Sequence, residues 1–395
     1  MMLVVKGVSF VSLLGLSLSL IGCGSNSPSA KLQSAPEKVR IKGRYIVKMK
    51  DSNSVERLIR AESNLDVRHK FEHALNGFSA ELSEDQLENL LKSDEVESIS
   101  EVARYRLSET QPNAPWGIDR IDQESGTLDK KYNYNFTGSG VNAYIIDTGI
   151  NVKHKDFEGR AINGTDVTVD KGTKLEGVDG HGHGSHVAGT VGSATYGVAK
   201  KVNLIAVKVF DSTGGEASDE TVIAGIDFSI GDHKAKKGPS VANLSLVGSA
   251  SEVLDKAINA AIEAGINVVV AAGNDNSDAC KYSPARVTGA ITVAAMDQGD
   301  RKASYSNHGA CVDVIAPGSR IKSTWKGSDT ATNTIDGTSM ASPHVAGVVA
   351  LYLEKNQKAT VTEIHDFIIS SSLSGKVRGF SSTTPNRLLS TQWGL

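Results

Sequence analysis

The chain has 395 residues, which is more than one small domain needs and enough for a large catalytic core with accessory segments. Hydrophobic residues make up 39% of the sequence, as in an ordinary folded protein. The formal net charge of −3 offers nothing to attract nucleic acid and argues against a polybasic membrane binder. Collagen, coiled coil, wholesale disorder and a disulfide-dense mini-protein are excluded by the same figures.

The first residues have the pattern of an export signal. A positively charged start is followed by an uncharged, mostly apolar stretch at 7–21, too short for a comfortable membrane span. This stretch ends in Leu-Ile-Gly-Cys, which resembles a bacterial lipobox, so we expect a lipoprotein signal peptide at 1–22 and lipidation of Cys23. The alternative is a plain secretory signal with an incidental cysteine. Residues 23–40 are expected to form a tether.

A shift in charge content predicts two folded units. In residues 31–107, 28 of 77 residues are charged, against 58 of 288 in residues 108–395. The smaller unit, at 41–107, has a βαββαβ pattern typical of a ferredoxin-like α+β domain. Its predicted elements are strands at 45–49, 65–71, 77–82 and 96–99, a helix at 55–62, and a second helix behind the capping box that starts at Ser83.

The larger unit, at 108–395, alternates strands and helices. Four near-continuous apolar runs are typical of strands buried on both faces, at 141–146, 202–207, 241–246 and 266–271. Helical spacing of apolar residues predicts a helix at 252–264, and another is expected at about 339–354. The pattern predicts an α/β fold with a mostly parallel central sheet and helices on both faces.

Cys280 and Cys311 are the remaining cysteines and lie downstream of the export signal. An even pair in an oxidising compartment predicts a disulfide, and a zinc site needs more ligands than these two provide. The alternative is a pair of buried free thiols.

Three polar segments lie where a predicted strand ends or a predicted helix begins, which is where open α/β sheets collect reactive residues. Asp147 directly follows the strand at 141–146, His183 lies in a stretch rich in glycine and histidine, and Ser339 opens the late helix. Their chain order, Asp, His, Ser, matches one known catalytic triad. It differs from the serine-first order of α/β-hydrolases and the histidine-first order of chymotrypsin-like enzymes.

Other interpretations of these segments are weaker. Asp147-Thr148-Gly149 is also the aspartic-peptidase signature, but that chemistry needs two carboxylates that share a proton, and the sequence holds no second copy. His181, His183 and His186 could ligate a metal, although glycine spacers do not fix imidazoles as a helix would.

Together these segments resemble the subtilase family of serine peptidases, most closely its proteinase K-like branch. Asn113-Ala114-Pro115-Trp116-Gly117 resembles the start of that branch's mature enzyme, and the charged unit at 41–107 resembles a subtilase propeptide. The resemblance implies a subtilisin-like three-layer α/β fold behind a ferredoxin-like propeptide domain. It also implies a self-processing zymogen whose Ser339 is the nucleophile, His183 the base and Asp147 its orienting carboxylate, through an acyl-enzyme.

The resemblance extends to the residues around the triad. Asn274 matches the family's oxyanion donor, and the substrate is expected to lie between two backbone edges as an added strand. The implied substrate-binding residues are Gly214, Glu216, Ser245, Leu246, Val247, Gly248, Ala272 and Gly273. Glu216 and Val247 stand where the family has glycine, and these departures are expected to narrow the cleft.

No cofactor is expected for catalysis, but structural calcium is. The hard oxygens that calcium prefers cluster after the mature start. A further carboxylate, close to Cys311, resembles another calcium ligand of the family. The candidate ligands are Asp119, Asp122, Gln123, Asp129 and Asp313. A plain solvated acidic turn is the alternative for the first four.

The expected partners are protein and peptide substrates and the chain's own propeptide, with no nucleic acid. The enzyme is expected to be a secreted monomer, whose precursor touches the bacterial outer membrane or cell surface only through the lipid on Cys23. Cleavage is expected near Ser108–Glu109. The alternatives are a catalytically silent subtilase fold used for binding and a serine esterase.

Overall fold

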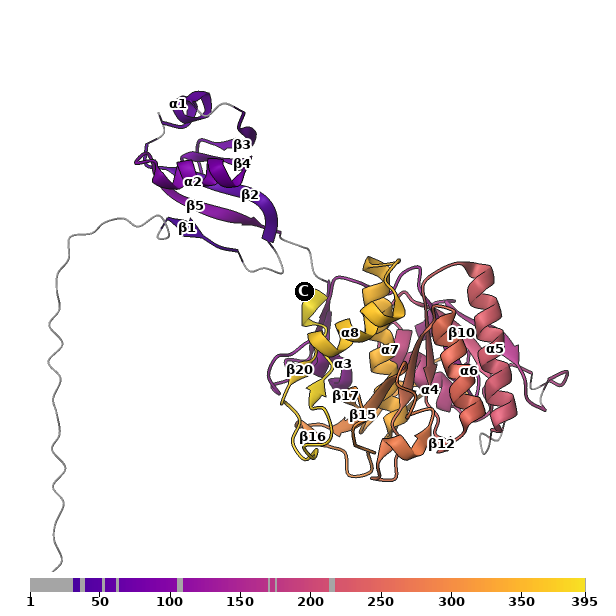
Figure 1. Cartoon of the computed structure of the whole chain (residues 1–395). Coiled ribbons are helices and arrows are strands. Elements are labelled where there is room, and N and C mark those ends of the chain that lie inside the picture. Colours follow the sequence, from indigo (N-terminus) through magenta and orange to yellow (C-terminus); the bar gives the residue numbers. More distant parts are fainter. Residues whose placement is uncertain are drawn as a thin grey trace, which may run out of the picture. The chain divides into compact units, whose positions relative to one another are not determined.

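A computed structural model describes residues 31–35, 40–51, 54–61, 64–104, 109–169, 171–174, 176–212 and 217–394 (Figure 1). The chain divides into two compact units, residues 1–105 and 106–395. The predicted signal peptide, Cys23 and the residues just before the expected cleavage site lie outside the described residues.

The first unit is a ferredoxin-like sheet with two helices. In chain order its elements are β1 (Leu32–Gln33), β2 (Arg40–Met49), α1 (Ser54–Ala61), β3 (Asp66–Phe71), β4 (Gly77–Glu81), α2 (Glu84–Lys92) and β5 (Val96–Ala103). The strands lie in the order β1-β5-β2-β4-β3. The predicted βαββαβ pattern is present, and the capping box at Ser83 starts α2. β1, inside the expected tether, was not anticipated and pairs in parallel with β5.

The second unit is built on a ten-stranded sheet, in the order β20-β21-β17-β15-β13-β11-β8-β10-β9, with β16 on β15. From β17 to β9 along this order, neighbouring strands are parallel. The seven parallel strands are β8 (Asn142–Asp147), β9 (Ala161–Asp166), β10 (Asn203–Lys208), β11 (Ser240–Leu244), β13 (Asn267–Ala271), β15 (Ile291–Asp297) and β17 (Val314–Pro317). The short remaining strands of this sheet are β16 (Arg301–Lys302), β20 (Leu373–Ser374) and β21 (Arg387–Leu388).

Helices cover both faces of this sheet, which gives the predicted three layers (Figure 1). α4 (His183–Gly192) and α7 (Thr338–Lys355) pack on one face, in a core with Ala143 and Ile145 of β8. α5 (Asp219–Lys236) and α6 (Glu252–Glu263) pack on the other, in a core with Tyr144 and Ile146. Successive β8 side chains therefore point to opposite faces, as strand geometry requires. α3 (Trp116–Ile121) and α8 (Val361–Ser371) complete the main helices.

Short elements join these layers. Two-stranded pairs are formed by β6 (Glu109–Pro112) with β7 (Lys131–Tyr134), β12 (Gly248–Ser249) with β14 (Tyr282–Ser283), and β18 (Ile321–Thr324) with β19 (Thr332–Ile335). A disulfide joins Cys280 and Cys311, whose Cα atoms lie 5.4 Å apart, so the predicted pairing is present. Among the described residues, no helix has the length and apolar character to cross a bilayer.

The first strand of the second unit, β6, is fastened by a buried lysine. Lys200 is 5% exposed, and its ammonium donates to Ala194 O (3.0 Å), Gly197 O (3.1 Å) and Gln111 Oε1 on β6. The same ammonium lies 5.3 Å from the ring centre of Tyr132 on β7. Burial lowers the pKa of Lys200 to about 7, because an apolar setting disfavours the charged form.

Candidate active site

The three residues of the predicted triad lie at the ends of elements, at the edge of the large sheet where its parallel strands end. Asp147 is the last residue of β8, His183 is the first residue of α4, and Ser339 is the second residue of α7. In a parallel sheet the carboxyl ends of strands share one edge, and the helices that follow begin there. Residues more than 190 positions apart in sequence can therefore lie in one cleft.

Asp147 and His183 form a close pair. His183 Nδ1 lies 2.8 and 2.9 Å from the two carboxylate oxygens of Asp147, which is 1% exposed. The carboxylate also accepts the Thr148 backbone N–H at 2.7 Å. Burial disfavours a charged His183, but the negative charges of Asp147 and Asp179 outweigh it, so the pKa of His183 is raised. With Nδ1–H donated to the carboxylate, neutral His183 carries its lone pair on Nε2.

Ser339 begins a helix that is buried along almost its whole length. Its hydroxyl donates to Ser245 O at 3.1 Å, and its own carbonyl accepts the Ser245 hydroxyl at 2.8 Å. Ser245 follows β11, so these two bonds tie the start of α7 to the end of a central strand. The unpaired N–H groups of a helix start favour negative charge nearby.

Asn274 is oriented by its neighbours. It follows β13, and its side-chain oxygen accepts the Thr338 backbone N–H at 2.9 Å and the Thr338 hydroxyl at 3.0 Å. The Thr338 hydroxyl in turn accepts the Gly273 backbone N–H at 3.1 Å. These bonds occupy the amide oxygen of Asn274 and leave its NH₂ group as the donor for a ligand.

One cavity of about 290 Å³ brings these groups together. It is lined by Thr148, His181, His183, Phe210, Ser245, Leu246, Val247, Ala271, Gly273, Asn274, Thr338 and Ser339. Histidine, serine and amide groups face a mostly apolar hollow, which is the arrangement that small polar sites in enzymes use. Asp147 lies behind His183 and is not part of the lining.

The predicted substrate-binding residues divide into three groups. Ser245, Leu246, Val247 and Gly273 line the cavity. Gly248 lies in β12 and pairs with Ser283, while Ala272 is fully buried just behind the lining. Gly214 and Glu216 lie outside the described residues.

Sequence reasoning missed five lining residues, Thr148, His181, Phe210, Ala271 and Thr338. Thr148 and Thr338 directly follow or precede a predicted triad residue, and that adjacency is a usable signal. His181 was noted only as part of a histidine cluster, and the structure places its ring 6.3 Å from that of His183. Phe210 follows β10 with no motif to mark it.

The predicted calcium ligands near the mature start do lie together. Asp119 accepts the backbone N–H groups of Asp129 and Lys130, and Gln123 donates to both Asp122 and Asp129. Burial raises the pKa of Asp122 to about 6, and the nearby carboxylates add to this effect. The donors are of the kind that suits calcium. Within the described ranges, however, no three His, Cys, Asp or Glu side chains converge well enough to hold a metal ion.

Asp313 lies apart from that cluster. Its carboxylate accepts the Thr292 backbone N–H at 2.8 Å and faces His365 Nε2 at 3.6 Å. The Asp313 charge raises the pKa of His365. An imidazole therefore already lies beside this carboxylate.

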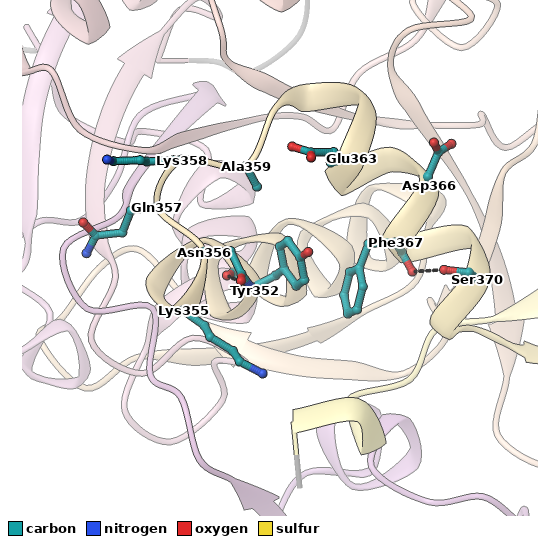
Figure 2. A pocket seen from close by; sticks show the side chains of 10 residues that line it. All are labelled: Tyr352, Lys355, Asn356, Gln357, Lys358, Ala359, Glu363, Asp366, Phe367 and Ser370. Atoms are coloured by element: carbon teal, nitrogen blue, oxygen red, sulfur yellow. Dashed lines mark hydrogen bonds between the residues drawn. The ribbon is translucent and has the colours of Figure 1, made fainter. Parts of the chain in front are cut away.

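A wider cavity of about 750 Å³ lies between the end of α7 and one side of α8 (Figure 2). Figure 2 shows the Tyr352 and Phe367 rings next to each other, and their ring centres lie 3.9 Å apart; Lys355 and Lys358 also line the cavity. None of the predicted site residues lines it. The reactive groups are gathered in the smaller cavity.

Comparison with known families identifies the chain. Residues 138–390 match the Subtilase family of peptidases, and residues 44–108 match peptidase inhibitor I9. This chain belongs to the subtilase family. It is a subtilisin-like serine endopeptidase with an inhibitor-type propeptide domain, which confirms the resemblance to the subtilase family.

Similar proteins support the assignment over nearly the whole chain. "Extracellular serine proteinase" of a Thermus species is 43% identical over 408 residues, covering 96% of this chain and 98% of that protein. "Alkaline serine exoprotease A" of Vibrio alginolyticus is 44% identical over 368 residues, covering 88% and 67%. A solved cold adapted subtilisin-like serine proteinase is 47% identical, with a TM-score of 0.66, and covers 71% of this subtilase and 98% of that chain.

Proposed function

We propose that this subtilase hydrolyses peptide bonds in proteins through Asp147, His183 and Ser339. The observation that carries the proposal is that His183 and Ser339 line one cavity while His183 is hydrogen-bonded to Asp147 behind it. Ser339 Oγ would turn its proton from Ser245 O to His183 Nε2 as it attacks the substrate carbonyl carbon. The raised pKa of His183 suits a group that must take up this proton.

The reaction needs no co-reactant besides water. A bond forms between Ser339 Oγ and the carbonyl carbon, and the proton moves to His183. When the C–N bond breaks, His183 returns that proton to the leaving amine and an acyl-enzyme remains. Water then attacks the acyl carbon by the same route and restores Ser339. Asp147 keeps the imidazole in the productive tautomer and stabilises the imidazolium.

The developing oxyanion would be held by two donors, the Asn274 NH₂ group and the Ser339 backbone N–H. Thr338 holds the other end of the Asn274 amide at 2.9 and 3.0 Å, so the donor is oriented before substrate arrives. Donors that need no reorganisation are the effective ones in such sites.

The cleft should disfavour bulky aromatic side chains at P1, the substrate residue on the carbonyl side of the scissile bond. Val247 stands where the family has glycine, and a Val247 methyl lies only 3.5 Å from where a Cβ on Gly273 would be. Glu216 adds a negative charge to the predicted opposite edge. Profiling with a peptide library tests this proposal, and cleavage after Phe or Tyr as good as in a glycine-walled relative contradicts it.

We also propose that the chain is made as a secreted, self-processing zymogen of the proteinase K-like branch. The inhibitor I9 domain would occupy the cleft until cleavage near Ser108–Glu109. A lipid on Cys23 would tether only the precursor, because Cys23 lies on the propeptide side of that cleavage. Mass spectrometry that finds the acyl chain and Ser339 on one intact mature polypeptide overturns this release.

Calcium is proposed as a structural ligand of the loop that holds Asp119, Asp122, Gln123 and Asp129. A cation there would relieve the mutual repulsion of these carboxylates, while catalysis by the triad needs no metal. Removal of calcium with a chelator should lower the melting temperature of the Ser339→Ala protein. An unchanged melting temperature counts against calcium at this site.

Casein digestion by wild type and Ser339→Ala tests the proposed function. We expect wild type to digest casein and the variant to lose nearly all activity, by a factor on the order of 10⁶. A chain that cleaves small esters but leaves casein intact is an esterase. A folded wild type that does neither is a binding protein.

A further inference from the structure

A second buried carboxylate lies beside the proposed triad. Asp179 is 4% exposed and precedes α4 by four residues. A buried carboxylate is costly unless hydrogen bonds compensate it. Asp179 accepts five: Thr148 Oγ1 (2.9 Å), His181 N (3.1 Å), Gly182 N (2.7 Å), Ser185 N (2.9 Å) and Ser185 Oγ (2.5 Å).

Three of these bonds hold the start of the helix that carries His183. Gly182 is the N-cap residue of α4, and it has no side chain with which to cap the helix. The first N–H groups of a helix lack partners within it. Asp179 accepts the N–H groups of Gly182 and Ser185, on either side of His183, and its negative charge suits the positive end of the helix.

A fourth bond reaches the segment that carries Asp147. Thr148 follows Asp147, and its backbone N–H donates to the Asp147 carboxylate at 2.7 Å. Its hydroxyl donates to Asp179 and accepts the Gly184 backbone N–H at 2.9 Å. The Thr148 hydroxyl thus lies between Asp179 and α4, directly behind the Asp147–His183 pair.

We propose that Asp179 is a positioning residue, whose buried carboxylate locks the segment bearing Asp147 and the start of α4 into the alignment that the His183–Asp147 pair requires. The proposal rests on the triad function proposed above. Asp179 touches no reacting atom, so it acts through Thr148 and the turn at 181–185. The sequence offers this role no motif, because Asp-Gly reads as an ordinary turn.

Asp179 also contributes negative charge behind His183. Together with Asp147 it raises the pKa of His183 against the effect of burial. During catalysis His183 becomes a cation, and a fixed buried carboxylate nearby stabilises that state without rearranging. The two effects, alignment and charge, have different experimental signatures.

The experiment compares Asp179→Asn with wild type by kcat, KM and the pH profile of kcat/KM. The amide keeps the shape but loses the charge and part of the accepting capacity. We expect kcat to fall about 10-fold with KM little changed. The acidic limb of kcat/KM should move to lower pH by about half a unit, since a nearby negative charge is removed. The control Asp232→Asn, on α5, removes a carboxylate that accepts a hydrogen bond from the Tyr144 hydroxyl. It should change neither kcat nor the acidic limb of kcat/KM.

A second pair of variants keeps the proposal testable should Asp179→Asn fail to fold. Thr148→Val removes the hydroxyl that links Asp179 to the Asp147 segment, and Thr148→Ser retains it. We expect Thr148→Val to lower kcat but to leave the acidic limb of kcat/KM at the wild-type pH, because the Asp179 charge remains. Thr148→Ser should have a kcat close to that of wild type. An Asp179→Asn enzyme within twofold of wild type with an unmoved limb, or Thr148→Val equal to wild type, overturns the proposal.

These experiments distinguish a wrong role for Asp179 from a wrong assignment of the triad. If Ser339→Ala remained active, the triad would be wrong. If Ser339→Ala is inactive while Asp179→Asn behaves as wild type, only the role of Asp179 is wrong.

Discussion

Acidification should destabilise this subtilase through two buried neutral histidines. His186 is 0% exposed and its Nε2 contacts Ile321 O at 2.9 Å; His344 is 1% exposed and its Nδ1 donates to Met340 O at 2.9 Å. Burial lowers the pKa of His186 to about 3 and that of His344 to about 4, from an ordinary value of 6.5. Neither accepts a proton in the folded state at pH 5.

The direction and the size of this change in the free energy of unfolding follow from proton linkage. As the pH falls below 6.5, the unfolded chain protonates both residues and the folded chain does not, so the free energy of unfolding falls. Each histidine contributes about 1.4 kcal/mol per pH unit, which at pH 5 is about 2 kcal/mol each and about 4 kcal/mol together. Asp122, with its pKa raised to about 6, opposes this by about 1.4 kcal/mol because it protonates first in the folded state. The net loss from these three groups is about 2–3 kcal/mol.

Two histidines with raised pKa, His183 and His365, act in the opposite direction in the upper part of this pH range. The stabilisation from His183 and His365 is fully present below pH 6.5 and is lost only as the pH rises through their folded pKa values. Their contribution therefore grows as the pH falls from 7.5 towards 6.5, which offsets part of the loss, and is nearly constant between pH 5 and 6.

Urea unfolding of the full-length Ser339→Ala protein at pH 7.5 and pH 5.0 measures the effect without self-digestion. His344→Gln, made in the same background, should reduce the pH-dependent loss by about 2 kcal/mol, whatever its own cost at pH 7.5. An unchanged pH dependence in His344→Gln would refute the reasoning.

Three further predictions concern other parts of the second unit. Replacing Cys280 and Cys311 with serine should lower the free energy of unfolding by about 3–4 kcal/mol, since their bond closes a loop of 31 residues. Unfolding of this variant and of the parent, each with and without reductant, checks this. Asn274→Ala should lower kcat about 10²–10³-fold, the range known for this donor in a subtilisin relative, with KM little changed. A higher KM with an unchanged kcat would contradict this prediction. Lys200→Met should speed amide exchange in β6 and lower the free energy of unfolding by about 1–3 kcal/mol, because the three oxygens that accept from the buried ammonium lose their donor. The exposed pair of Lys201 with Glu158 makes Lys201→Met the matched control, with little expected effect.

Much of the fold was predictable because its strands are buried on both faces. The apolar runs at 141–146 and 202–207 correspond to β8 and β10 within one residue at each end. α6 could be found since its apolar residues share one face. α5 was not predicted, because the side it buries includes Gly225 and Ser229 as well as Val222 and Ile226. Gly225 allows a close approach, since a Cβ there would lie 2.5 Å from a Val209 methyl.

The candidate site was predictable where a residue type and its place in an element coincide. Asp147, His183 and Ser339 each stand at a strand end or a helix start, and Asn274 follows a buried strand. Asp179 is different. Its proposed role rests on five hydrogen bonds, four to residues within six positions and one to Thr148, 31 positions away, and only the folded chain joins these two segments at one carboxylate.

The edges of the site were the least predictable. β11 ends at Leu244 and not at residue 246, so the backbone from Ser245 onward leaves the sheet and lines the cavity. Phe210 faces the same cavity from the far side of β8, where β10 ends. Such contacts depend on which strands are neighbours in the sheet, and apolar periodicity carries no information on strand order.

Active-site labelling tests the central claim most directly. A fluorophosphonate reacts with a serine only where a neighbouring base has activated it, so we predict one label per molecule of active enzyme, mapped by peptide mass spectrometry to Ser339. His183→Ala should abolish the labelling while the fold persists. A folded protein that is not labelled, or is labelled at another serine, would contradict the account.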